Sequence, residues 1–461
     1  MIDPMRVAIA AVLVVVLSAV GTYMYASRIP GPTIKVIQPA KVIGQNTTLE
    51  VSVEATGGKL GSLNVRLEQA GEATALFDLA SPTGASVQQD TAERMRLTRP
   101  IGSRAIPSLK EGPVRLIVQA SRPVLFGIRT ASSTVSVDLQ ARLTPPQVNV
   151  MSNHHFVNHG GAELVIYRAM PAESVSGVRV GDRVYPGYPA SGLGVVSSDP
   201  SLKACFFALL DDQDLTTPVR VFARDEAGNE TFSTLDAQVF PRKFRNSRIE
   251  VTDTFMANVM PDIVMHAPEL GPIPASPEEL LAAYLKANRE LRQTNAERIR
   301  SVAAGSGDRA LWSGPFLQLG NSKVESGFAD RRTYFYKGEE VDRQVHLGFD
   351  LAVTVKVPVL AGNTGRVLFA DYLGIYGNTV ILDHGMGVQS LYAHMSSISV
   401  KVGDTVERGA ELGRSGTTGL AGGDHLHFAV LAAGYPVSPV EWWDGHWIED
   451  RITRKVREAS Q

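Results

Sequence analysis

The chain has 461 residues, which is too long for one typical domain, so two to four domains are expected. Its content of 44% apolar and 20% charged residues is ordinary for a globular protein. The formal net charge of −2 argues against nucleic acid as the main partner, and the one cysteine, Cys205, excludes an intrachain disulfide framework.

The N-terminal segment predicts contact with a membrane. The stretch from Val7 to Ala26 carries no charge and is mostly Ala, Val, Leu and Ile, and its length suffices for a helix that crosses a hydrocarbon core. We expect residues 1–29 to form a retained transmembrane signal anchor. A cleaved signal peptide is the alternative, because Ala19-Val20-Gly21 is an acceptable cleavage site. Arg6 favours a cytoplasmic N-terminus, so residues after about 29 are expected outside the cytoplasm, on the periplasmic or cell-wall side.

Residues 30–145 have the pattern of short strands. Apolar and polar residues alternate from Thr47 to Val53 and again from Leu63 to Leu67, and turn residues separate the runs. Strands at this rhythm, without a helical pattern, predict a β-sandwich. Pro145-Pro146 marks the expected end of this domain.

A second β domain and a linker follow. Residues 146–245 are predicted to form an immunoglobulin-like β domain, because Val219 to Asn229 is typical of its last hairpin. In the expected linker, residues 246–313, Ser276-Pro277-Glu278-Glu279 is a capping box with proline at the first helical position, which predicts a helix over 277–304. This helix is either a spacer packed on a neighbouring domain or a regulatory helix that covers a cleft or binds a partner.

The strongest chemical signal lies in residues 314–445, where four histidines and one aspartate gather: His346, Asp350, His394, His425 and His427. Imidazole and carboxylate groups are zinc ligands, and a catalytic site keeps one position open for water. Five such groups exceed the three ligands required, and hydrolysis also needs groups that move protons. On a strand, His425 and His427 would face the same side. His346 and Asp350 need a bend between them, which Gly348 tolerates.

These residues form three ordered motifs: His-x-Gly-x-Asp from His346, Tyr392-Ala393-His394, and His425-Leu426-His427-Phe428 after a Gly-rich turn. Together they resemble the LytM/lysostaphin family of zinc endopeptidases, which cut peptide cross-bridges in bacterial peptidoglycan. The resemblance covers roughly Gly314 to Asp444. It implies that one zinc ion is bound by His346, Asp350 and His427, and that His394 and His425 are catalytic. The family's usual Glu after the last motif is replaced by Ala429.

The predicted fold is mainly β, with two immunoglobulin-like β-sandwich domains, a linker helix and a C-terminal lysostaphin-type β-sheet peptidase domain, followed by a tail over 446–461. The implied activity is that of a cell-envelope zinc metalloendopeptidase that hydrolyses cross-links or stem peptides of peptidoglycan. The expected partners are peptidoglycan peptides, the membrane and, as an open option, an envelope protein. The alternatives are a non-catalytic envelope scaffold or amidase activator, a peptidase for proteins, and iron in place of zinc.

Four further residues are candidates for contacts at the site. Arg332, Tyr334 and Tyr336, which precede the first motif, are candidates for stabilising a tetrahedral intermediate. Asn321 lies further upstream and could touch substrate or occlude the metal. The roles of His394 and His425 relative to each other stay open, as does the peptide bond that is cut.

Overall fold

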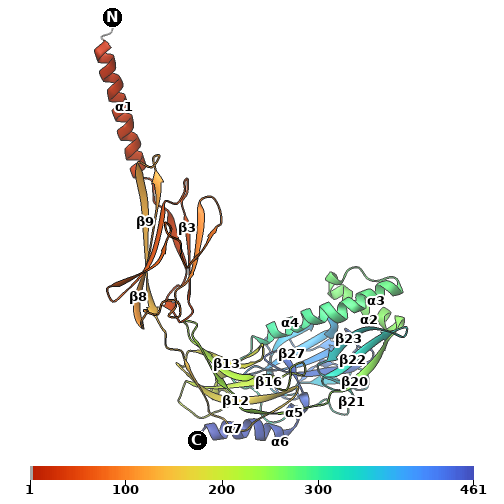
Figure 1. Ribbon diagram of the computed structural model, residues 1–461. Helices are drawn as coiled ribbons and strands as arrows, with labels where there is room; N and C mark the ends of the chain where they lie inside the picture. Colours follow the sequence, from red (N-terminus) through yellow and green to blue (C-terminus); the bar gives the residue numbers. More distant parts are fainter. Residues whose placement is uncertain (1–3) are drawn as a thin grey trace. The chain divides into compact units, whose positions relative to one another are not determined.

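The computed structural model describes residues 4–461 (Figure 1). Residues 1–3, which begin the predicted anchor segment 1–29, lie outside the described part. The chain is mainly β, with 43% strand and 21% helix, which confirms the fold class predicted from the rhythm of short strands. It divides into two compact units. The first ends at Pro146 and takes in Arg224–Glu230, and the second comprises Gln147–Ala223 and Thr231–Gln461. The finer division into domains stays a prediction.

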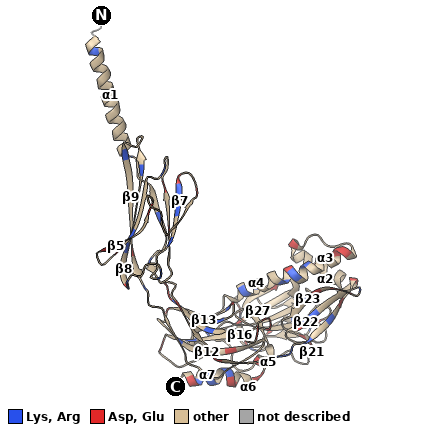
Figure 2. Ribbon diagram, viewed as in Figure 1, with Lys and Arg blue, Asp and Glu red and all other residues tan. Residues whose placement is uncertain are grey.

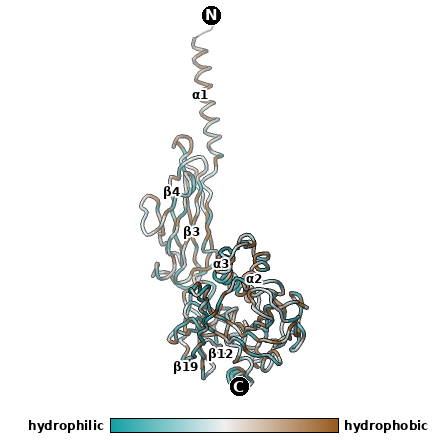
Figure 3. The backbone as a smooth tube through the Cα atoms, turned by 90° about the vertical axis from the view of Figure 1, so that its right-hand side faces the viewer, coloured by the Kyte–Doolittle hydropathy of each residue, from teal (hydrophilic) through white to brown (hydrophobic). Residues whose placement is uncertain are grey.

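The first unit begins with one long apolar helix, α1 (Pro4–Ser27), which is long and apolar enough to cross a membrane. Arg6 is the one charged residue in its sequence, and Figure 2 shows the rest of the helix in tan. Its large apolar side chains are exposed, among them Val12 and Leu17. Figure 3 shows the backbone of α1 coloured by the hydropathy of its residues. An exposed apolar helix surface of this kind suits a membrane anchor or a signal sequence.

Two sheets form the rest of the first unit. Apolar residues alternate along the strands, so Leu49, Val51 and Val53 face inward and pack in one core with Leu63 and Val65. The first sheet has the order β1 (Thr33–Gln38), β3 (Thr48–Glu54), β7 (Arg94–Pro100), β6 (Ser86–Gln89). The second has the order β2 (Val42–Ile43), β9 (Arg129–Ala141), β8 (Gly112–Val124), β4 (Ser62–Gln69), β5 (Glu72–Asp78).

The second unit begins with three further sheets. Its central strands β12 and β16 are buried over almost their full length. The first sheet has the order β10 (Gln147–Val150), β12 (Gly161–Met170), β16 (Leu202–Leu209), β15 (Tyr188–Pro189), after which comes the turn η1 (Ala190–Leu193). The others are β14 (Arg183–Pro186), β13 (Val175–Val180), β17 (Val219–Arg224), β18 (Glu230–Thr234), and the pair β11 (His155–Asn158), β19 (Ala237–Phe240).

The largest sheet of the second unit brings the motif residues together. Its order is β21 (Lys323–Ser326), β24 (Phe349–Ala352), β32 (His425–Ala432), β28 (Val388–Met395), β27 (Asn378–Gly385), β26 (Gly365–Tyr372), β30 (Thr405–Val406), with β33 (Tyr435–Val437) beside β32. Two small sheets adjoin it: β20 (Asn246–Val251), β22 (Asp330–Tyr336), β23 (Glu339–His346), and β25 (Pro358–Leu360), β31 (Glu411–Arg414), β29 (Ser397–Ile398). Strands β24, β32 and β28, which carry three motifs far apart in sequence, are therefore direct neighbours.

Helices lie along one side of the second unit in Figure 1. They are α2 (Asp253–His266), η2 (Pro268–Leu270), α3 (Pro277–Lys286), the π-helical turn η3 (Ala287–Leu291) and α4 (Arg292–Ala303), with the short turn η4 (Gly374–Tyr376) packed beneath them. The predicted capping box is present, since Ser276 and Glu279 exchange hydrogen bonds at the start of α3. The helix predicted over 277–304 consists of α3, the π-helical turn η3 and α4, which follow one another without a break. Helix α2 was not predicted.

The C-terminal residues pack on the rest of the unit. They form α5 (Pro439–Trp443), α6 (Gly445–Ile448), the π-helical turn η5 (Glu449–Thr453) and α7 (Arg454–Ala459). Trp447, Ile448 and Ile452 are buried, and Nζ of Lys455 lies 2.8 Å from Oε1 of Glu163 on β12. The segment predicted as a tail over 446–461 thus covers strand β12.

Candidate metal centre

The antiparallel pairing of β24 with β32 places the first and last motifs opposite each other. Asp350 pairs with His427, and Ala352 pairs with His425. His425 and His427 are two apart on a strand, so their side chains share a face, as the sequence predicts, while Leu426 is buried on the opposite side. Strand β28 pairs with the other edge of β32 and ends at His394 and Met395.

Three ligand atoms converge at this place. Nε2 of His346 lies 2.9 Å from Oδ1 of Asp350 and 3.0 Å from Nδ1 of His427, and the His427 nitrogen lies 3.0 Å from the same carboxylate oxygen. Because they are only 3.0 Å apart, Nε2 of His346 and Nδ1 of His427 cannot both be protonated. Ligands around a tetrahedral zinc ion stand about 3.3 Å apart. His346, Asp350 and His427 therefore form a cluster that could hold one metal ion.

Gly348 allows the chain to bend between two of these residues. His346 ends β23 in a three-stranded sheet, whereas Phe349 begins β24 in the largest sheet. A Cβ atom added at position 348 would lie 2.5 Å from both Cε1 and Nε2 of His427. The glycine is thus required by the close approach of the His427 ring as well as by the bend.

Neighbouring groups orient the three residues. Nδ1 of His346 lies 3.2 Å from Oγ of Ser326 and 3.1 Å from the carbonyl of Gly327. Arg332 donates a hydrogen bond of 2.9 Å to Oδ2 of Asp350, which leaves Oδ1 for the cluster. Burial by itself would raise the pKa of Asp350, but the three neighbouring histidines hold that pKa well below its usual range. The carboxylate is therefore ionised and fixed before any ligand arrives.

The two histidines predicted as catalytic lie side by side. The ring centroids of His394 and His425 are 4.8 Å apart. Each Nδ1 lies 2.8 Å from a backbone carbonyl, that of Thr418 for His394 and that of Gly423 for His425. A proton on Nδ1 satisfies those contacts and leaves Nε2 of each ring as a base.

The pKa values of these two histidines are driven apart. Burial, together with the charges of His425 and His427, lowers the pKa of His394 well below its usual value. Burial also opposes charge on His425, but Asp350 outweighs it and raises the pKa of His425, whose Nε2 is 3.6 Å from Oδ1 of that aspartate. Two adjacent imidazoles with different proton affinities can pass a proton between them and a bound ligand.

A cavity of about 610 Å³ is lined by His346, Asp350, His394 and His425, whereas His427 is buried and is not among its lining residues. Arg332 and Tyr334 line it beside the metal cluster, whereas two other predicted contact residues do not. The hydroxyl of Tyr336 donates a hydrogen bond of 2.6 Å to Asp253, and Asn321 lines a separate apolar hollow of about 530 Å³. The structure therefore brings two of the four candidates to the cluster.

The cavity wall includes residues that the sequence reasoning missed. Tyr376 on η4 packs on His427 with ring centroids 5.5 Å apart. Asn288 and Arg292 reach the cavity from the π-helical turn and α4. Two signals were available. Gly374 and Gly377 flank Tyr376 and both have a positive φ, and Asn288 is a polar residue on the otherwise apolar stripe of its helix.

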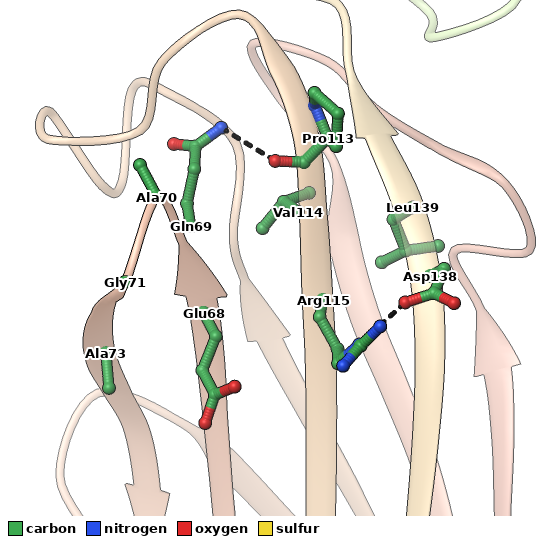
Figure 4. A pocket seen from close by; sticks show the side chains of 10 residues that line it. All are labelled: Glu68, Gln69, Ala70, Gly71, Ala73, Pro113, Val114, Arg115, Asp138 and Leu139. Carbon is green, nitrogen blue, oxygen red and sulfur yellow. Dashed lines mark hydrogen bonds and ion pairs between the residues drawn. The ribbon is translucent and has the colours of Figure 1, made fainter.

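A further hollow of about 600 Å³ lies in the first unit among β4, β5, β8 and β9 (Figure 4). Arg115 is paired there with Asp138 at 2.7 Å, and the amide of Gln69 donates to the carbonyl of Pro113. No histidine or cysteine lines it. The hollow thus lacks the groups that make the cluster in the second unit chemically distinctive.

Comparisons with known proteins agree with this geometry. Residues 344–439 match peptidase family M23. A stretch of 97 residues is 40% identical to DD-carboxypeptidase/endopeptidase Mpg of Neisseria meningitidis serogroup B, covering 21% of this chain and 22% of that protein. A stretch of 121 residues is 34% identical to peptidoglycan DD-endopeptidase ShyA of Vibrio cholerae, covering 26% of this chain and 27% of that protein. The matches thus span about a quarter of the length of these relatives.

Two solved structures are also similar to parts of this chain. A putative peptidase M23 from Pseudomonas aeruginosa is 19% identical, covers 62% of this chain and 94% of its own, and has a TM-score of 0.37. The catalytic domain of lysostaphin from Staphylococcus simulans is 27% identical, covers 28% and 96%, and has a TM-score of 0.24. Because both TM-scores are below 0.5, the assignment rests on the sequence match. The C-terminal part of this chain carries a peptidase family M23 domain of the LytM/lysostaphin type.

Proposed function

We propose that this chain is a membrane-anchored zinc metalloendopeptidase that hydrolyses cross-links or stem peptides of peptidoglycan. The observation that carries the proposal is the convergence of three ligand atoms within 3.0 Å of one another, beside a cavity that His346, Asp350, His394 and His425 line. The names of the relatives, which include peptidoglycan DD-endopeptidases, support the choice of substrate.

His346, Asp350 and His427 would hold the metal. Two imidazoles and one carboxylate suit zinc, which when bound acidifies a water molecule and polarises a carbonyl group. Arg332 keeps Oδ2 of Asp350 occupied, so the carboxylate presents a single oxygen to the ion. Ser326 and Gly327 fix the ring of His346 from behind.

His394 and His425 would manage the protons. Their Nδ1 atoms are held by backbone carbonyls, so each ring is fixed in orientation and exchanges a proton through Nε2. Between them, the pair removes the proton of the attacking water and delivers one to the leaving amine. Tyr334 and Tyr376, which line the same cavity, are the tyrosines placed to donate a hydrogen bond to the developing oxyanion.

The N-terminal helix would hold the enzyme at its substrate. Helix α1 would stay in the membrane as an anchor, with everything after about residue 29 on the periplasmic or cell-wall side. Peptidoglycan lies in that compartment, so anchoring limits the enzyme to the layer of wall near the membrane.

The test is a digest of purified, cross-linked peptidoglycan by the detergent-solubilised full chain, with released fragments identified by mass spectrometry. New peptide ends are expected, and they should disappear on chelation and in His427→Ala. The matched control is His446→Ala, because this histidine is exposed and lies outside the cavity. An intact, zinc-loaded protein that releases no fragments would overturn the proposal in favour of a non-catalytic scaffold.

A further inference from the structure

The helix α3–η3–α4 is fixed to the catalytic strands. Nδ2 of Asn288 donates a hydrogen bond of 2.8 Å to Oδ2 of Asp342 on β23, and Nε of Arg289 donates one of 2.9 Å to Oδ1 of the same residue. Further along, Oδ1 of Asn295 accepts a hydrogen bond of 3.0 Å from the backbone N–H of Ile375 on η4. The helix is therefore fixed as one wall of the cavity.

The π-helical turn sets which side chains this wall presents. Inserting one residue into a helical turn rotates the residues after it relative to those before, and such turns are frequent at functional sites. Here the turn covers Ala287–Leu291, and it leaves both Asn288 and Arg292, at its end, on the cavity side together with Tyr284. Asn288 is fully buried, so its position is not adjustable.

Arg292 is held in place by neutral acceptors. Its Nε donates a hydrogen bond of 3.1 Å to the carbonyl of Asn288, and its Nη2 donates one of 2.6 Å to Oδ1 of the same residue. Across residues 4–461, no carboxylate forms an ion pair with it. A guanidinium carries five N–H donors, so these two bonds fix its plane and leave donors for a ligand.

Arg292 differs in this respect from the other arginine of the cavity. Arg332 is paired with Asp350 at 2.9 Å and with Asp330 at 3.5 Å. Its charge is therefore already neutralised by the cluster it supports. Among residues 4–461, Arg292 is the cavity arginine that forms no ion pair, and it also borders a second hollow that Asp211 and Asp212 line.

Arg292 also stands close to the reacting centre. It lies three residues before Asn295 on α4, and Asn295 holds the turn η4 through Ile375. The next residue of that turn, Tyr376, packs on His427 of the metal cluster. One tyrosine thus separates the wall that carries Arg292 from the metal ligands, and Arg292, His346 and Asp350 line the same cavity.

We propose that Arg292 binds a free carboxylate of the peptide, one or two residues from the scissile bond, and so selects stem peptides whose carboxylates are not amidated. The proposal rests on the proposed function and names the substrate class for it. A planar guanidinium can bind a carboxylate with two parallel hydrogen bonds, which a carboxamide cannot match in charge or geometry. Arg292 would be a specificity residue that touches substrate, with Asn288 as its positioning residue.

The test compares two cross-linked muropeptides of the same sequence, one with free carboxylates and one with these groups amidated. The zinc-loaded full chain in detergent should cleave the carboxylate form with a kcat/KM at least about tenfold higher, the effect expected for one charge-assisted contact. In Arg292→Gln the ratio of the two kcat/KM values should fall to about one, because kcat/KM decreases for the carboxylate form alone. Arg292→Lys should keep part of the preference for the carboxylate form. Arg298→Gln, an exposed arginine on the same helix, is the matched control and should keep all of it.

Each other result overturns the proposal. Equal rates on both muropeptides in the wild-type chain would show that no carboxylate is read. A loss on both forms alike in Arg292→Gln would assign Arg292 to the packing of the wall. If the wild-type chain cleaves neither form, the proposed function fails, and calorimetric binding of the same two muropeptides decides the inference separately. Binding that is tenfold tighter for the carboxylate form, and lost in Arg292→Gln, would support it; equal binding would overturn it.

Discussion

A Cβ atom at position 348 would lie 2.5 Å from Cε1 of His427, so the methyl group of alanine and this imidazole ring cannot occupy their places together. Gly348→Ala is therefore expected to displace a metal ligand and to weaken zinc binding by at least about tenfold. Competition with a chromogenic chelator measures the affinity. Gly320→Ala is the control, because nothing lies within 4 Å of a Cβ there. An unchanged affinity in Gly348→Ala would mean that the backbone gives way instead of the ring.

Arg332→Met tests the support of the cluster from behind. It removes the hydrogen bond of 2.9 Å to Oδ2 of Asp350 and leaves that carboxylate free to rotate. Losing such an outer contact typically lowers metal affinity by about 10–100-fold. Arg343→Met removes an exposed pair with Glu340 and should leave the affinity unchanged. If both variants bind zinc equally well, Asp350 is oriented by the histidines alone.

Substitution of the two side-by-side histidines should separate binding from hydrolysis. His394→Ala and His425→Ala are each expected to keep zinc but to lose about 10²–10⁴-fold in kcat, the usual contribution of a proton-transferring side chain. Metal content by mass spectrometry and rates on a defined muropeptide give the two readings. A variant that loses its metal together with its activity would place that histidine among the ligands.

The local geometry of single motifs could be predicted because it depends on neighbouring residues, whereas the joining of the three motifs into one site was an implication of the family resemblance. Alternation on a strand puts His425 and His427 on one face whatever surrounds them, and the bend at Gly348 follows from the spacing of His346 and Asp350. The capping box at Ser276 is equally local. These features depend on residues within a few positions of each other, so the sequence contains them.

Other features depend on partners that are distant in the sequence. Arg292 reaches the cavity only because a π-helical turn precedes it, and a stripe of apolar residues does not reveal such a turn. Residues 446–461 space Ile448, Ile452 and Val456 four apart, as on a helix, but the partner of Lys455 is Glu163, 292 positions away, which no local pattern identifies. Helix α2 contains Pro261, which argues against a helix in a sequence, although the helix exists because Met256, Met260 and Ile263 are buried.

A buried histidine outside the metal cluster gives a prediction on pH. Burial, with the charges of Lys455 and His154, lowers the pKa of His155 to about 3. Between pH 6.5 and about 3 the unfolded chain therefore binds a proton that the folded chain excludes, so stability falls as the pH drops through this range. From pH 7 to pH 5 this group should cost about 2 kcal/mol.

The measurement is urea denaturation at pH 7 and pH 5. The difference in unfolding free energy between the two values should shrink by about 2 kcal/mol in His155→Gln. His446→Asn, at an exposed position outside this cluster, is the control and should leave the difference unchanged. The same pH dependence in wild type and His155→Gln would show that other groups cause it.

Lys455→Met tests how the C-terminal helix is held. Glu163 and Lys455 are both almost fully buried, so removing the cation leaves an uncompensated carboxylate in the core. We expect a loss of about 3–5 kcal/mol in the free energy of unfolding, and a smaller loss in the double variant Glu163→Gln/Lys455→Met. Arg457→Met, which breaks an exposed pair with Glu449, should cost less than about 1 kcal/mol. A loss of that small size in Lys455→Met would mean that the helix is held by Trp447 and Ile452.

The wall built from α3, η3 and α4 ends at Ala303, well before the family match begins at residue 344. Under the proposed function, the metal cluster and this helical part of the cavity wall are thus encoded by separate stretches of the chain, whereas Tyr376 of the same wall lies within the family match. Mutations in residues 277–303 can alter which peptides fit without touching a metal ligand, so the two properties can evolve independently. Under the proposed function, bacteria that modify the carboxylates of their wall could change the substrate preference by altering one helix, and exchange of that helix between relatives should transfer the preference.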